Sequence, residues 1–199
     1  MINRINRMLK IPGKVVFTGG PSGGKTSIIE VVQRHFGKKV VVVPEAATIL
    51  YGGGFPRLTG DVSMKHIQRA IYYTVRELED IVAANSPEAS VILCDRGTLD
   101  GLAYWPKTGE SFFESIGSTL ENEYARYSLV LHLRSPKTAE AYQLSKTRIE
   151  SHRQSLSLDK KMESVWESHK NRFIVEEEPD FLVKVNRVIE ILEKEIPKI

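Results

Sequence analysis

The sequence predicts an α/β domain in three layers, in which helices cover both faces of a five-stranded, mostly parallel sheet. Short apolar runs alternate along the chain with stretches of helical periodicity, which is the order expected of repeated strand-helix units. The runs are apolar throughout rather than at every second position, which is typical of strands buried on both faces. A glycine-rich stretch follows the first run, and sheets of this class bind ligands at the carboxyl ends of their strands.

The first half of the chain contains three predicted strands and two predicted helices. The strands cover residues 15–18, 39–43 and 91–94, and the first helix covers residues 25–36. Before the third strand, apolar residues recur at the spacing of one helix face; they are Ile67, Ile71, Val75, Leu78 and Val82. Pro87 marks the end of this long helix.

The second half repeats the pattern. Residues 129–133 and, more weakly, residues 173–175 predict the fourth and fifth strands. The last helix is indicated by Phe181, Val185, Val188, Ile189 and Leu192. Right-handed connections between such strands make the sheet parallel. Residues 134–172, with nine basic and five acidic side chains, are interpreted as a small, basic helical lid.

Charge divides the chain into a short arm and one domain. Residues 1–14 hold four basic residues and no acid, so residues 15–199 carry a net charge of −1 although the whole chain carries +3. We interpret the arm as either a docking segment or a frayed terminus. A domain with almost no net charge predicts no nucleic-acid partner.

The remaining composition predicts a cytoplasmic protein. Cys94 is the only cysteine and cannot form an internal disulfide, and the start of the chain lacks the apolar core of a secretory signal. No apolar run reaches the ~18 to 20 residues of a membrane span. The sequence leaves the oligomeric state open.

Residues 19–26, called the phosphate loop below, match the pattern G-x-x-x-x-G-K-[ST] between a predicted strand and a predicted helix. Glycines let main-chain N–H groups converge on phosphate oxygens, and the helix N-terminus adds a favourable dipole. Lys25 can reach the outer phosphates of ATP or GTP, and the Thr26 hydroxyl can bind their magnesium ion. We expect the nucleotide to contact Gly19, Gly20, Pro21, Ser22, Gly23, Gly24, Lys25, Thr26 and Ser27.

Asp95 directly follows the third apolar run, as expected of the acid that holds the magnesium shell beside such a loop. We therefore predict a metal site formed by Thr26 and Asp95. Arg96 comes next and is interpreted either as a catalytic arginine or as part of a surface ion pair. Asp100 either contacts the acceptor or caps the following helix.

Glu45 follows the second run, where a carboxylate can orient or deprotonate an acceptor hydroxyl; the alternative is an acid that stabilises a helix N-terminus. The three glycines at residues 52–54 and the following Arg57 predict either a hinged flap over substrate or an idle surface loop. Gln68 faces either the acceptor or solvent. The expected acceptor contacts are Glu45, Arg57, Gln68, Arg96 and Asp100.

Two arginines of the lid, Arg148 and Arg153, are candidates to neutralise charge on a transferring phosphoryl group; the alternative is a solvated helix face. The expected catalytic residues are Lys25, Glu45, Asp95, Arg96, Arg148 and Arg153.

Five strings in this order carry a family resemblance; they are residues 19–26, 44–47, 53–57, 95–101 and 104–106. Together they resemble the NadR-type AAA-domain family, whose P-loop proteins are related to small nucleoside and nucleotide kinases. One branch resembles ribosylnicotinamide kinases, which use ATP, and another resembles a GTP-binding protein with a role in trafficking. The resemblance implies that Lys25, Thr26 and Asp95 hold nucleotide and magnesium, and that Glu45 is a base.

These observations predict a magnesium-dependent phosphotransferase that moves the terminal phosphoryl group of ATP or GTP to a hydroxyl of a small, nucleoside-like acceptor. The alternative is a nucleotide-dependent switch with slow or no turnover that binds a protein or lipid partner. The Asn-Lys-x-Asp string of conventional GTPases is absent from the sequence. This absence argues against a Ras-like version of the switch but does not decide between ATP and GTP.

Overall fold

The computed structural model describes residues 12–136 and 151–196. Within them, five strands form one sheet in the spatial order β2-β3-β1-β4-β5, and every neighbouring pair is parallel. The strands are β1 (Gly13–Thr18), β2 (Val40–Val43), β3 (Val91–Asp95), β4 (Leu129–Leu133) and β5 (Arg172–Val175). The predicted α/β fold with a five-stranded parallel sheet is therefore confirmed.

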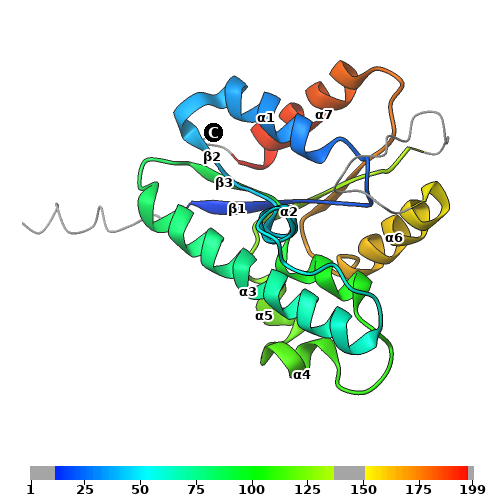
Figure 1. The fold of residues 1–199 in the computed structure, drawn as a ribbon. Coiled ribbons are helices and arrows are strands. Elements are labelled where there is room, and N and C mark those ends of the chain that lie inside the picture. Colours follow the sequence, from blue (N-terminus) through cyan, green and yellow to red (C-terminus); the bar gives the residue numbers. More distant parts are fainter. Residues whose placement is uncertain (1–11, 137–150, 197–199) are drawn as a thin grey trace, which may run out of the picture.

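Helices cover both faces of this sheet (Figure 1). One face carries α1 and α7, and the other carries α3, α4, α5 and α6 (Figure 1). The α-helices are α1 (Lys25–Phe36), α2 (Ala46–Gly52), α3 (Asp61–Asn85), α4 (Phe112–Ile116), α5 (Leu120–Tyr124), α6 (His152–Val165) and α7 (Phe181–Glu195). Two 3-10 helices are η2 (Gly37–Lys39) and η3 (Thr98–Tyr104).

The central strands bury both of their faces, which explains why their sequences are apolar throughout. In β1, Val15 and Phe17 pack into a core shared with α1 and α7, whereas Val16 packs into a second core with Tyr72 of α3 and Trp166 beyond α6. All five side chains are almost completely buried. Because successive strand residues point to opposite faces, one apolar strand contributes to both layers.

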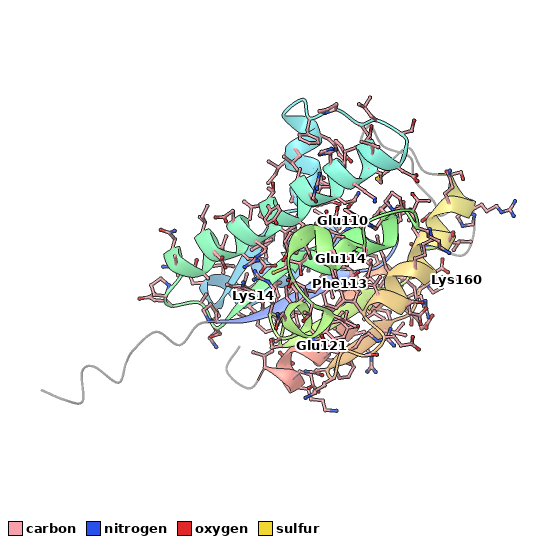
Figure 2. The ribbon with its side chains drawn as sticks, turned by 90° about the horizontal axis from the view of Figure 1, so that it is seen from below. Lys14, Glu110, Phe113, Glu114, Glu121 and Lys160 are labelled. Carbon is pink, nitrogen blue, oxygen red and sulfur yellow. The ribbon has the colours of Figure 1, made fainter. Side chains whose placement is uncertain are left out.

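Several element boundaries differ from the prediction by one or two residues. β1 begins at Gly13, so Lys14 is part of the strand, and its ammonium lies 2.7 Å from the carboxylate of Glu79 on α3. Figure 2 shows Lys14 well separated from Lys160 on α6. Gly52 is the last residue of α2 and Gly53 is its C-cap, so the first of the three glycines belongs to the helix rather than to the loop.

The parallel arrangement brings four loops to one edge of the sheet. The phosphate loop follows β1, Glu45 follows β2, Arg96 follows β3 and Ser135 follows β4. The residues that carry the sequence motifs therefore meet where a doubly covered sheet binds its ligands.

Within the described residues, no helix has the length and apolar character needed to cross a bilayer.

Candidate active site

A cavity of about 450 Å³ opens at the carboxyl edge of the sheet. Lys25 and Thr26 lie in its wall beside Asp95, and Gln68 lies in the part of the wall that α3 contributes. The other residues of the lining that the sequence singles out are Pro21, Ser22, Glu45, Arg57, Arg96 and Asp100. Residues of the phosphate loop and the residues expected to contact an acceptor thus line one cavity.

The phosphate loop has the backbone that its glycines permit. Gly19 and Gly24 have positive φ angles of 117° and 80°, and Ser22 is a non-glycine residue at 62°. A β-carbon on Gly19 would lie 2.2 Å from the carbonyl oxygen of Leu133, so no other residue fits there. A residue in the left-handed conformation next to a right-handed one can turn main-chain N–H groups toward one concave side, which suits an anion.

Lys25 is buried, and its Nζ donates hydrogen bonds to the carbonyl oxygens of Gly19 (3.1 Å) and Gly20 (2.6 Å). Burial, with the positive charge of Arg96 beside it, lowers the pKa of Lys25 to about 7, although Asp95 opposes the shift. The ammonium is therefore easily deprotonated until an anion arrives to stabilise it.

Thr26 and Asp95 are in direct contact, because the Thr26 hydroxyl donates a 2.6 Å hydrogen bond to Oδ2 of Asp95. Burial and the nearby Glu45 raise the pKa of Asp95, while Thr26 and Lys25 partly offset that effect. A hydroxyl and a carboxylate are the hard oxygen donors that Mg²⁺ prefers, and Mg²⁺ commonly takes only one or two protein ligands beside phosphates. The two side chains present thus fit the predicted metal.

Arg96 is bound to the phosphate loop, and its ion pairs with Glu45 and Asp100 lie in the cavity wall rather than on the open surface. Its Nη1 donates to the Gly19 carbonyl (2.5 Å) and lies 3.4 Å from the carboxylate of Asp100, and its Nε lies 3.4 Å from Oε1 of Glu45. Burial opposes its charge, yet Glu45 and Asp100 hold the pKa of Arg96 above its usual value. Its φ of 91° is strained for a non-glycine residue, and such strain is concentrated at functional sites.

The position of Glu45 is compatible with both interpretations of this residue. It is the N-cap residue of α2, and it also lines the cavity with 31% of its side chain exposed. Burial alone would raise the pKa of Glu45, but Arg96, the 2.6 Å hydrogen bond from Thr48 and the charge of Lys25 together lower it. Glu45 is therefore ionised at neutral pH and able to accept a hydrogen bond from a hydroxyl in the cavity.

Asp100 is buried, and its carboxylate accepts hydrogen bonds from two other elements. Its Oδ1 accepts from the hydroxyl of Thr18 and from Nε1 of Trp166, each at 2.7 Å. The helix-cap interpretation is wrong, because the N-cap of η3 is Gly97 and has no side-chain hydrogen bond. Asp100 lies in the cavity wall but mainly ties the end of β1 to the C-terminal end of α6.

The far wall of the cavity is largely apolar. Gln68 is 5% exposed and so does not lie on a solvated helix face. Arg57 is exposed, and its guanidinium lies 4.8 Å from the centre of the Tyr51 ring. The apolar residues around them are Tyr51, Leu58, Met64, Ile71, Val75 and Tyr104. Such a wall accommodates a small molecule with one flat or apolar part.

The two lid arginines have different outcomes. Arg148 lies outside the described residues. Arg153 is exposed in the first turn of α6 and is not part of the cavity wall, so the structure does not bring it to the site. Ser155 and Asp159 occupy the buried face of this helix. Because Arg153 precedes Ser155 by two residues, it points about 200° away around the helix.

Four residues outside the sequence motifs and outside the cavity wall form hydrogen bonds with the main chain of the phosphate loop. Asp159 accepts a 2.7 Å hydrogen bond from the Gly20 N–H, and Ser135, Ser155 and Lys184 bind loop carbonyls. Burial opposes the charge of Asp159, but hydrogen bonds from His132 and Gly20 lower its pKa to about 2. Only Lys184 leaves a signal in the sequence, as a lysine on the otherwise apolar face of the last helix.

Comparisons with known proteins agree with this fold. A family model described as an AAA domain matches residues 14–181. A search of curated proteins gives no match.

Three solved structures are similar. A structure of NadR protein in complex with NR has a TM-score of 0.67 at 18% identity and covers 98% of this chain and 54% of that one. NadR protein in complex with NAD and AMP-PNP has a TM-score of 0.62 at 15% identity, covering 98% and 52%. Thymidylate kinase from Candida albicans has a TM-score of 0.61 at 12% identity, covering 92% of each chain. The chain thus spans about half the length of the NadR structures and shares their fold.

Proposed function

The chain belongs to the AAA domain family, and on that premise we propose that it is a magnesium-dependent kinase for a small, nucleoside-like acceptor. The single observation that carries the proposal is the shared cavity, in which Lys25 and Glu45 line the same space. A phosphate donor bound at Lys25 and an acceptor hydroxyl bound at Glu45 would therefore lie next to each other. ATP is the proposed donor, and GTP is the alternative that the experiment below includes.

At the donor end, the phosphate loop and Lys25 bind the triphosphate. Catalysis of phosphoryl transfer depends mainly on positioning and on neutralising charge, so these groups need no covalent chemistry. Thr26 and Asp95 would hold magnesium, which supplies charge neutralisation at the phosphates when it is bound. The AMP-PNP in one of the similar NadR structures is consistent with ATP as donor.

At the acceptor end, Glu45 orients a hydroxyl for attack. Its carboxylate is ionised and its position is fixed by Thr48 and Arg96, so it can accept the hydroxyl proton as the new bond forms. Gln68 and the apolar wall provide the mixed lining that a nucleoside needs. The similar structures are of a protein bound to NR and of a thymidylate kinase, which supports a nucleoside-like acceptor.

A transfer assay tests this function directly. The protein is incubated with magnesium and with ATP or GTP labelled in the terminal phosphate, against a panel of nucleosides that includes ribosylnicotinamide. We expect label in one acceptor, and none when the same preparation carries Lys25→Ala. Tight nucleotide binding with slow hydrolysis and no labelled acceptor would instead favour the nucleotide-dependent switch.

Replacing Glu45 by glutamine is expected to lower kcat at least about 10²-fold, because the amide cannot take the proton of the acceptor hydroxyl. The KM for the nucleotide should change little, since Glu45 belongs to the acceptor end. Steady-state kinetics with both substrates measure this split. Glu30→Gln, at an exposed position on α1, is the matched control. A Glu45→Gln variant with unchanged kcat would remove Glu45 from the chemistry.

The pKa of Lys25, about 7, predicts proton uptake when the triphosphate binds. At pH 8 the empty loop holds mostly neutral Lys25, and phosphate charge favours the ammonium, so binding takes up close to one proton. The terminal phosphate itself, with a second pKa of about 6, no longer titrates there. Affinity should accordingly fall as pH rises above 7. Calorimetry in two buffers of different ionisation enthalpy measures the uptake, and Lys25→Arg should show almost none.

A further inference from the structure

Main-chain carbonyl groups of the phosphate loop are held from outside by side chains of other elements. The Pro21 carbonyl accepts hydrogen bonds from the hydroxyls of Ser135 (2.8 Å) and Ser155 (3.1 Å). The Gly23 carbonyl accepts one from Nζ of Lys184 (3.1 Å). These donors come from the segment after β4, from α6 and from α7, and none of them lines the cavity.

The geometry of the peptide bond gives these contacts a consequence for anion binding. In a trans peptide the C=O of one residue and the N–H of the next point in opposite directions, and no peptide bond among the described residues is cis. A Pro21 carbonyl fixed toward Ser135 and Ser155 therefore turns the Ser22 N–H the other way. A Gly23 carbonyl fixed toward Lys184 does the same for the Gly24 N–H.

This orientation needs support because it is strained. Ser22 has a φ of 62°, which costs a non-glycine residue of the order of 1 kcal/mol. Gly24 also has a positive φ, and an unsupported glycine has more alternative conformations than any other residue. Without external donors, the loop would relax into arrangements whose N–H groups no longer converge.

Lys184 is unusually placed for a residue that only packs. It is 7% exposed, and a buried lysine is rare unless its charge is matched. Both of its observed hydrogen bonds end on main-chain carbonyls, those of Gly23 (3.1 Å) and Arg134 (3.0 Å). Burial lowers its pKa, and the neighbouring Glu177 and Asp159 oppose that shift. A methionine would fill the same volume without the cost of burying an amine.

We propose that Lys184, Ser135 and Ser155 are positioning residues that preset the phosphate loop: by holding the Gly23 and Pro21 carbonyls outward, they keep the next N–H groups directed at a triphosphate. The inference rests on the proposed nucleotide binding at this loop. It assigns the loop's affinity partly to residues that do not touch the nucleotide.

The test compares Lys184→Met with Lys194→Met, which removes the same charge from an exposed position on the same helix. Losing a hydrogen bond from a charged donor should weaken ATP binding roughly 10-fold or more. The KM for the acceptor should stay within about twofold, because the acceptor end is untouched. In amide NMR spectra, the shift of the Gly24 N–H on adding ATP should shrink in Lys184→Met. A general structural defect would weaken both substrates equally.

A second variant keeps the test decisive if Lys184→Met fails to fold. The double replacement of Ser135 and Ser155 by alanine removes only two hydroxyls and should weaken ATP binding about tenfold. Ser157→Ala, at an exposed position on α6, is its control. Unchanged ATP affinity in a folded Lys184→Met variant, or in the double serine variant, overturns the inference. If the wild-type protein itself binds neither ATP nor GTP, the proposed function fails first.

Discussion

Lys25→Ala is expected to lower kcat/KM for the nucleotide by roughly 10³-fold, with most of the loss in the transferring step. The ammonium is fixed at the mouth of the phosphate loop by the Gly19 and Gly20 carbonyls, so it is preorganised for a phosphate without being bound to a carboxylate. Phosphoryl transfer spreads negative charge over the equatorial oxygens, and a buried cation stabilises that charge more than the ground state.

The same variant should fold as well as the wild type. Lys25 is buried with a depressed pKa, so at neutral pH its charge opposes folding, and removing that charge offsets the two hydrogen bonds that the variant loses. In the wild type, stability attributable to this lysine rises as pH increases from about 7 toward the unfolded pKa, because the unfolded chain then holds more protons. Kinetics and thermal melts together check both statements. Lys38→Ala, exposed at η2, is the control, and near-normal kcat/KM in Lys25→Ala would contradict the assignment.

The chemistry at strand ends could be predicted from the sequence because it is local. Residues 19–26 carry their own turn and helix start, and Asp95 is placed by the apolar run that precedes it. A parallel sheet then brings the ends of β1, β2 and β3 together without further information. The fold class and the part of the cavity wall formed at strand ends follow from that rule, whereas Gln68 and Arg57 reach the wall from α3 and the segment before it.

The support of the loop could not be predicted in the same way. Asp159 binds the Gly20 N–H across 139 positions of sequence, and Ser155 binds the Pro21 carbonyl across 134. No spacing pattern encodes such contacts, which depend on how α6 packs against the loop. Arg153 shows the same limit, because its place in the basic segment after β4 does not reveal which way it points, and Ser155 and Asp159 define the buried face of α6.

At the end of β1 opposite to the phosphate loop, Glu79 is completely buried. Its carboxylate contacts Lys14 (2.7 Å), Arg126 (2.6 Å) and the hydroxyl of Tyr127 (2.6 Å). The Tyr127 hydroxyl also accepts a 2.9 Å hydrogen bond from the Thr98 N–H. Glu79 therefore joins α3 to β1, to the chain before β4 and to the loop that begins with Arg96.

Replacing Glu79 by alanine is expected to destabilise the protein by about 3–5 kcal/mol, because two partly buried cations lose their counter-charge while a cavity opens. For a chain of this size, that loss lowers Tm by roughly 6–20 °C. Thermal melts compare it with Glu77→Ala, at an exposed position two residues earlier on α3. Glu79→Gln should lose less, since its amide oxygen still accepts hydrogen bonds. Equal melting of the alanine variants would show that Lys14 and Arg126 do not need this carboxylate.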